Sequence, residues 1–304
     1  MSVHLEVLAL QSIHRIARRC GVEVNLPSFF ELYGASPEVF STVLANLRTI
    51  VRKLIDAGYV TWWDVYLESD IGRERMLIAE DIGLRSSDAV LDVGCGRGYF
   101  TIAAARFAGY VVGVDLMDGF GRYGWWSSFK LAMKLLGLAG RVQGVRCNAV
   151  KLPFKDSSFN VVVAVHSLRN FQDTCAIVGA LREMKRVVVR GGLVVLVENL
   201  PEVRSRRQEI HLKLHSIRVE ILGDELPYLS KNELIELVGE VGFRDLEVEV
   251  RDYGLCSTPV IFHVDEGKLS GLEEELVGEY RRAIELVRVF GECSTPIAIL
   301  KAWK

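Results

Sequence analysis

The 304-residue sequence lacks the features that would place it in a membrane or in an oxidising compartment. Its apolar runs are shorter than the roughly 18 residues that a membrane-spanning helix requires. The N-terminus carries the acidic Glu6 and shows no signal-peptide cleavage pattern. The six cysteines form no C-x-x-C pair, so neither a zinc site nor a redox dithiol is indicated. We therefore expect a cytoplasmic protein with reduced cysteines, no membrane span and no bound metal.

A large charge of either sign is also absent. The 37 Lys and Arg residues nearly balance the 39 Asp and Glu residues, and the formal net charge is −2. This balance gives no strong sign of nucleic-acid binding. Hydrophobic residues make up 50% of the chain and charged residues 25%, as in soluble globular proteins of one or two domains. Asn and Gln are scarce beside Val, Glu and Arg, a composition that is weakly typical of a thermophile.

Residues 1–70 are predicted to form a mainly helical or winged-helix-like extension. Apolar residues recur at helical spacing over 3–19 and over 37–57, which predicts two amphipathic helices. Ser36 and Pro37 suit the N-cap and the first position of the second helix. The extension could serve as a homodimer surface, a substrate lid or a partner-binding module, and its residues do not rank these roles.

The segment 59–68, YVTWWDVYLE, is expected to leave the helical pattern and turn extended or aromatic. Its aromatic residues Trp62, Trp63 and Tyr66 have two interpretations. They either pack at a domain interface or form an aromatic wall of a substrate pocket. Tyr66 is the pocket candidate among them.

Three glycines at alternate positions follow a short apolar run in AVLDVGCGRGYFT, residues 89–101. The run predicts a buried parallel strand, Gly94, Gly96 and Gly98 allow a tight turn, and the helix behind it offers free N–H groups to an anion. This is a nucleotide cradle. A dinucleotide fold needs a small residue where Tyr99 stands, so NAD is the less favoured ligand.

An acidic residue ends the next predicted strand. Residues 110–114 are nearly continuously apolar and lead to Asp115. The second strand of such a fold lies beside the first, so its end faces the same crevice, where a carboxylate can accept hydrogen bonds from ribose hydroxyls. The alternative is an ordinary acid at a strand end.

The segment 116–138 is unusually aromatic and glycine-rich at its start. Phe120, Tyr123, Trp125 and Trp126 would lie at the carboxyl edge of the sheet, where ligands bind in open α/β folds. They either cap that edge or line the substrate pocket, for which Trp125 and Trp126 are the candidates.

Three blocks in order resemble motifs of class I S-adenosylmethionine-dependent methyltransferases, most closely the type 11 and ubiquinone or menaquinone C-methyltransferases. The first is the D-x-G-x-G-x-G loop that begins at Asp92. The second is NAVKLPFKDSSFN at 148–160, which carries Asn148 and Asn160 where the family pattern has Asp. The third runs from HSLRNF at 166–171 through ALREMKRVVVRGG to a strand ending at Glu198.

The resemblance implies a fold, a cofactor and a set of contacts. The fold is α/β, a Rossmann-like sheet of seven strands, mostly parallel with one antiparallel strand, and with helices on both faces. The cofactor is S-adenosylmethionine, and the matching positions imply these contacts: Asp92, Gly94, Cys95, Gly96, Gly98, Asp115, Leu116, Asn148, Ala149 and His166.

Methyl transfer needs positioning, exclusion of water and, for a weakly acidic acceptor, a base. His166 directly follows the fourth predicted strand, and an imidazole titrates near neutral pH. It is therefore the first candidate for the general base, and the alternative is a packing histidine. Glu198, at the end of the fifth strand, is the second candidate.

Residues 71–304 are assigned to the methyltransferase domain. Within it, about 202–222 reads as a charged lid helix and about 269–291 as an inserted helix. His211 and His215 lie four residues apart on one face of the lid helix. We place them in the substrate pocket and not at a metal, because no third ligand accompanies them.

The sequence leaves three functions open. A small-molecule methyltransferase is favoured. An RNA or protein methyltransferase would use residues 1–70 for recognition, and a basic stripe there would favour RNA. A non-catalytic cofactor-binding subunit is the third, and an open substrate crevice would count against it.

Overall fold

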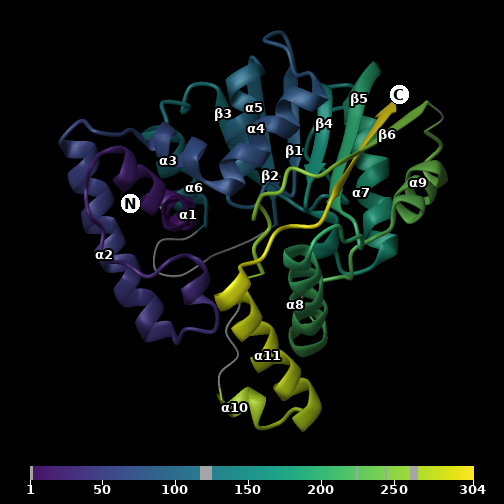
Figure 1. Cartoon of the computed structure of the whole chain (residues 1–304). Helices are drawn as coiled ribbons and strands as arrows, with labels where there is room; N and C mark the ends of the chain where they lie inside the picture. Colours follow the sequence, from purple (N-terminus) through teal and green to yellow (C-terminus); the bar gives the residue numbers. More distant parts are fainter. Residues whose placement is uncertain (1–2, 117–124, 224, 244, 261–265) are drawn as a thin grey trace. The chain divides into compact units, whose positions relative to one another are not determined.

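The computed structural model describes residues 3–116, 125–223, 225–243, 245–260 and 266–304. They fall into two compact units, each built from separate stretches of the chain. The helical unit comprises 1–74, 202–224 and 254–295, and the sheet unit comprises 75–201, 225–253 and 296–304. Figure 1 shows the elements coloured along the sequence.

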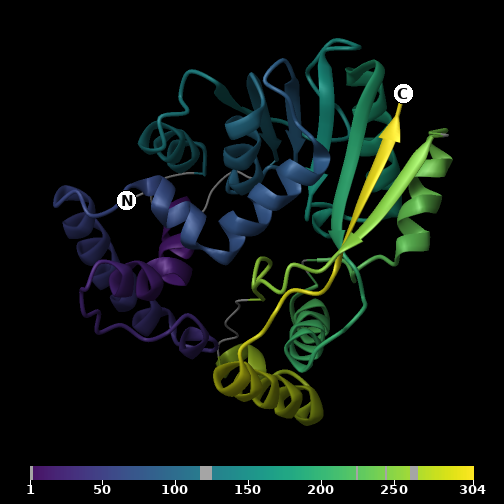
Figure 2. The same cartoon turned by 45° about the horizontal axis from the view of Figure 1, so that its top comes forward.

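The sheet unit contains seven strands in the order β3-β2-β1-β4-β5-β7-β6. They are β1 (Ala89–Val93), β2 (Tyr110–Asp115), β3 (Val142–Arg146), β4 (Phe159–Val165), β5 (Val188–Asn199), β6 (Leu246–Arg251) and β7 (Ile297–Trp303). Strands β1 to β5 are parallel, and β7 runs antiparallel to both β5 and β6. In Figure 2 the yellow β7 lies between them. The predicted sheet, with its one antiparallel strand, is confirmed.

Helices of the sheet unit bury their apolar faces against these strands. They are α5 (Tyr99–Phe107), α6 (Trp125–Leu135), α7 (Thr174–Val187) and α9 (Lys231–Glu240), while α4 (Asp70–Ile82) contains the division between the two units. Leu181 of α7, Val238 of α9 and Val162 of β4 belong to one buried cluster and have no exposed surface. Continuous apolar strands are expected where helices cover a parallel sheet.

The helical unit contains no strand among its described residues. Its elements are α1 (Val3–Arg19), the short 3₁₀ helix η1 (Phe30–Leu32), α2 (Pro37–Asp56), α3 (Trp62–Glu68), α8 (Arg206–Leu222), α10 (Glu266–Leu269) and α11 (Glu274–Phe290). Helix α1 packs on α2 and α3, and α11 packs on α8 and η1. Of the two predicted forms of the extension, the helical one is therefore found.

Local capping sets where two of these helices begin. Ser36 caps α2 as predicted, because its hydroxyl accepts a hydrogen bond from Val39 N at 3.4 Å. The extended form expected for 59–68 is wrong, since α3 occupies most of it. Thr61 N donates to Asp64 Oδ2 at 2.7 Å, while Asp64 N donates to Thr61 Oγ1 at 3.3 Å. This reciprocal capping box fixes the first turn of the helix.

The two units divide the chain differently from the sequence assignment. Segments 202–224 and 254–295 group with 1–74, whereas the sequence analysis placed them with the methyltransferase domain. Among the described residues, no helix combines the length and apolar character needed to cross a bilayer.

Candidate functional site

The glycine loop between β1 and α5 has no room for side chains at two of its three glycines. Gly94, Gly96 and Gly98 have φ angles of +71°, +49° and +76°, which lie in the region that only glycine enters freely. A Cβ at Gly94 would lie 2.6 Å from the Cβ of Ser167, and one at Gly98 would lie 2.5 Å from Cε2 of Phe129. No side chain caps α5 at Gly98. The predicted cradle is therefore present in its geometry.

The carboxylate of Asp115 lies against this loop. Asp115 Oδ2 accepts a hydrogen bond from Gly96 N at 2.8 Å. Strand β3 ends beside it, because Cys147 N donates to the carbonyl oxygen of Asp115 at 3.0 Å. The next two predicted cofactor positions, Leu116 and Asn148, are exposed. The ends of β1, β2 and β3 thus bring the predicted carboxylate and its neighbours to one edge of the sheet.

The other residues predicted to contact the cofactor at this edge are either partly accessible or buried. Ala149 is half-buried, and the side chain of Asn148 accepts from Val150 N at 3.1 Å, which forms a local turn. Asp92 and Cys95 are buried. Burial raises the pKa of the Cys95 thiol well above its usual range. Direct cofactor contacts by these residues stay predictions.

Asp92 links strand β1 to the helix that follows the glycine loop. It is only 1% exposed, and its Oδ2 accepts a hydrogen bond from the hydroxyl of Thr101 at 2.6 Å. Burial raises its pKa to about 7, although the Thr101 hydrogen bond acts in the opposite direction. Because Thr101 belongs to α5, this bond ties the end of β1 to the helix that follows the loop.

His166 and Glu198 come from adjacent strand ends. Strands β4 and β5 pair Val165 with Val197, and His166 N donates to Val197 O at 2.7 Å. His166 has a φ of +50° and is 6% exposed. A non-glycine residue with positive φ is strained and is often found at functional positions. The chain therefore turns sharply at the residue predicted to act as base.

Glu198 holds the chain that follows this turn. Its Oε1 accepts hydrogen bonds from Ser167 N at 2.8 Å and from Leu168 N at 2.7 Å. Burial raises its pKa to about 7, against the lowering effects of the Arg169 charge and of the two backbone hydrogen bonds. A carboxyl group with such a pKa can exchange a proton near neutral pH.

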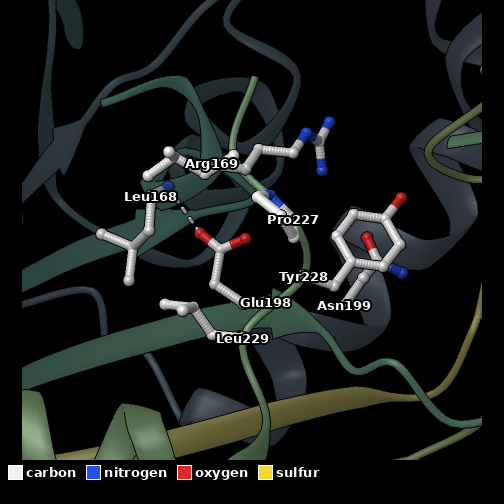
Figure 3. A pocket seen from close by; sticks show the side chains of 8 residues that line it. Leu168, Arg169, Glu198, Asn199, Pro227, Tyr228 and Leu229 are labelled. Atoms are coloured by element: carbon white, nitrogen blue, oxygen red, sulfur yellow. Dashed lines mark hydrogen bonds between the residues drawn. The ribbon is translucent and has the colours of Figure 1, made fainter. Parts of the chain in front are cut away.

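A small pocket surrounds the Glu198 carboxyl group. In Figure 3, Glu198 lies between Leu168 and Leu229 on one side and Tyr228 and Asn199 on the other. The complete lining is Leu168, Arg169, Glu198, Asn199, Leu226, Pro227, Tyr228 and Leu229. This lining is mostly apolar with a few polar groups, and the free space of the pocket, about 10 Å³, is close to that of one water molecule.

Arg169 connects two walls of this pocket. Its Nε lies 3.3 Å from Glu225 Oε2, and its guanidinium carbon lies 5.9 Å from the centre of the Tyr228 ring. Its carbonyl oxygen accepts from Leu226 N at 2.6 Å. Arg169 belongs to the HSLRNF motif, but no site role was predicted for it. No sequence motif near Tyr228 indicated that it lines a pocket, because its segment is far from HSLRNF along the chain.

The predicted aromatic pocket residues pack inside their own units. Tyr66 has no exposed surface and meets Trp63 edge-to-face at 5.8 Å. Trp126 is half-buried, meets Phe129 edge-to-face at 5.5 Å, and lies 2.6 Å from where a Cβ on Gly144 would be. These contacts show that both side chains pack within their units, and their assignment to the substrate pocket stays a prediction. Phe120, Tyr123 and the side chain of Trp125 lie outside the described residues.

His211 and His215 are buried in the helical unit. His211 Nδ1 lies 3.0 Å from Glu292 Oε2, and both side chains have no exposed surface. The other carboxylate oxygen accepts from Tyr33 OH and from Val260 N. Within the described part of the chain, no group of three or more His, Cys, Asp or Glu residues is arranged to hold a metal. The assignment of both histidines to the substrate pocket stays a prediction.

Known proteins resemble the sheet unit most clearly. A family model described as a methyltransferase domain matches residues 91–196. A demethylmenaquinone methyltransferase of Staphylococcus aureus (strain JH9) is 28% identical over 197 residues, which cover 59% of this chain and 76% of the relative.

Solved structures show the same fold at lower identity. A cyclopropane-fatty-acyl-phospholipid synthase-like protein from Lactobacillus casei ATCC 334 is 16% identical, with a TM-score of 0.59 over 79% of this chain and 93% of its own. A geranyl diphosphate methyltransferase solved with its cofactor is 18% identical, with a TM-score of 0.52 over 79% and 88%. The [4+2]-cyclase SpnF is 20% identical, with a TM-score of 0.51 over 81% and 84%.

Proposed function

Because the chain carries a class I S-adenosylmethionine-dependent methyltransferase domain, we propose that it moves the methyl group of this cofactor to a small-molecule acceptor. The observation that carries the proposal is the glycine loop with Asp115 against it, at the carboxyl ends of β1 and β2. In open α/β sheets, ligands bind outside the carboxyl ends of the strands. The curated relative named above also acts on a small molecule by its name.

The residues of the glycine loop fit the cofactor. Gly94 and Gly98 leave no space for side chains, so their backbone can approach a ligand closely. Asp115 lies beside Gly96, at the position expected to accept ribose hydroxyls. When bound, the cofactor supplies a methyl group already activated by a sulfonium. The chain then has to position the acceptor, exclude water and take up a proton where the acceptor has one to lose.

His166 and Glu198 are the two proposed proton acceptors. His166 is held by its backbone bond to Val197. Glu198 faces the pocket and has a pKa raised to about 7 by burial, so both of its protonation states are populated at neutral pH. His166→Ala is expected to lower kcat by about 10² to 10⁴-fold with nearly unchanged cofactor affinity if it removes the base. His14→Ala, in the helical unit, is the control.

RNA is the less favoured acceptor because the basic residues of the N-terminal extension are largely paired. Arg15 lies 2.9 Å from Asp70, Arg19 contacts Asp64 and Glu68, Arg48 lies 2.7 Å from Glu6, and Arg52 lies 3.6 Å from Asp56. Acidic partners offset the positive potential that would attract phosphates. The basic stripe that would favour RNA is therefore mostly neutralised within the chain.

Transfer from methyl-labelled S-adenosylmethionine distinguishes the three candidate functions. The purified chain would be incubated with the labelled cofactor and with separated small-molecule, RNA and protein fractions of a cell extract. Label in a small molecule supports the proposal. Label in RNA or protein contradicts it, and cofactor binding by calorimetry without transfer to any fraction supports a non-catalytic subunit.

A further inference from the structure

One short motif occurs twice in the C-terminal part of the chain. Residues 254–260 read GLCSTPV and residues 291–297 read GECSTPI, so both follow the pattern G-x-C-S-T-P with a β-branched residue after it. Gly254 and Gly291 both have positive φ angles, +65° and +71°. The two copies also hold two of the six cysteines of the chain, Cys256 and Cys293.

The two copies lie side by side, and the helical unit contains 254–260 of the first and 291–295 of the second. Strands β6 and β7 pair Arg251 with Ile297 in antiparallel register. Beyond that pair, Ser294 N donates to Leu255 O at 3.0 Å, in a register shifted by one residue from that of β6 and β7. This bond brings the two segments that carry Cys256 and Cys293 next to each other.

The two thiols have reciprocal contacts. Cys293 Sγ lies 3.6 Å from the carbonyl oxygen of Leu255, the residue before Cys256. Cys256 Sγ lies 3.7 Å from Oε1 of Glu292, the residue before Cys293. Each thiol thus contacts the residue that precedes the other cysteine, so the two segments bring both thiols into the same small region.

The surrounding contacts keep both segments in place. The Ser294 hydroxyl accepts from Ser257 N at 3.0 Å and from Thr258 N at 2.8 Å. Cys256 is 1% exposed and Cys293 is 5% exposed. Both thiols are thus buried in segments that hydrogen bonds tie together.

We propose that Cys256 and Cys293 form an intramolecular disulfide, a covalent link between the two copies of the motif, when the chain folds in the presence of a small-molecule disulfide such as oxidised glutathione. One cysteine thiolate attacks the reagent and releases one thiol. The second cysteine thiolate then attacks the mixed disulfide and releases the other. The protein loses two protons and two electrons, and the reagent becomes two thiols.

Burial decides when this link forms. It raises the pKa of Cys256 well above its ordinary value, and the charge of Glu292 acts in the same direction. Since the thiolate is the reactive form, the folded thiol reacts slowly. The bond therefore forms as the chain folds, and the experiment has to include refolding.

The test compares the full chain refolded with oxidised and reduced glutathione against the chain refolded with a reducing agent. We expect the free thiols to fall from six to four, the mass to fall by about 2 Da as two hydrogens leave, and a peptide map to link Cys256 to Cys293. The unfolding midpoint should rise by roughly 5 °C or more, because the link closes a long loop.

Matched variants separate this pair from other thiols. Cys256→Ala and Cys293→Ala should each abolish the loss of two thiols, whereas Cys175→Ala, at an exposed position, should leave it intact. Six free thiols in the refolded unmodified chain would overturn the proposal. So would a map that links a different pair, such as Cys95 with Cys147, and this measurement does not depend on whether a variant folds.

Discussion

Replacing Glu198 with glutamine should change how the stability of the chain depends on pH. The folded chain keeps a proton on this carboxyl group up to about pH 7, whereas the unfolded chain releases it near its ordinary pKa of 4.5. Between these values the folded state binds more protons than the unfolded state, so the free energy of unfolding falls as pH rises. Glutamine does not titrate, and its oxygen can still accept from Ser167 N and Leu168 N.

The size of the effect follows from the two pKa values. With 4.5 for the unfolded and about 7 for the folded carboxyl group, Glu198 removes about 2 to 3 kcal/mol of stability between pH 5 and pH 8. The loss is complete above about pH 8, since the group is then ionised in both states. Asp92, with its own raised pKa, contributes a loss of the same sign in both proteins. The difference between wild type and variant therefore isolates Glu198.

Urea unfolding at pH 5 and pH 8 measures this difference. We expect the wild type to lose about 2 to 3 kcal/mol more than Glu198→Gln between the two pH values. Glu183→Gln is the control, because hydrogen bonds to Arg186 lower the pKa of Glu183 below its ordinary 4.5, and the group is therefore ionised in the folded chain at both pH values. This variant should show nearly the same difference in stability between pH 5 and pH 8 as the wild type. Equal pH dependence in wild type and Glu198→Gln would show that Glu198 is ionised in the folded chain at neutral pH.

Three further variants test the cofactor cradle and the N-terminal helices. Asp115→Ala should weaken S-adenosylmethionine binding by about 1–3 kcal/mol in calorimetry, and unchanged affinity in a folded variant would make Asp115 a turn residue. Gly98→Ala should reduce cofactor affinity or folding, because its Cβ would meet Phe129, whereas Gly137→Ala has the same positive φ with open space around it and should cost less. Thr61→Ala should destabilise the chain by about 1 kcal/mol through loss of the α3 cap, while Thr49→Ala, exposed in mid-helix α2, should change it little. Equal unfolding free energies for the last two would contradict the capping role.

The sequence predicts those parts of the fold that depend on local patterns. Continuous apolar strands, the alternate glycines and the three ordered motifs led to the correct sheet and to the loop that holds Asp115 beside Gly96. Helix α3 was missed because its aromatic residues also suit strands. Its start depends on Thr61 and Asp64, a capping box with Asp in place of the usual Glu or Gln.

Contacts between distant segments could not be predicted in the same way. Tyr228 reaches Arg169 only because the segment 226–229 returns to the chain after β4. Glu292, which follows the C-terminal end of α11, contacts His211 of α8. Neither pairing leaves a periodic or compositional signal, since each depends on how complete elements pack. The pocket lining and the partner of His211 therefore needed three-dimensional information.

The turn after β4 and the chemistry of Glu198 depend on each other. The chain can leave β4 at a positive φ on His166 because the amides of Ser167 and Leu168, which then point inward, find one buried carboxylate oxygen. Glu198→Gln keeps this acceptor and removes the charge, whereas Glu198→Ala removes both. If Glu198 acts as the base, both variants should lose methyl transfer equally while only alanine loses cofactor affinity through a disordered turn. If its role is to hold the turn, glutamine should retain activity, and the ratio of the two rates measured with one labelled acceptor decides between these roles.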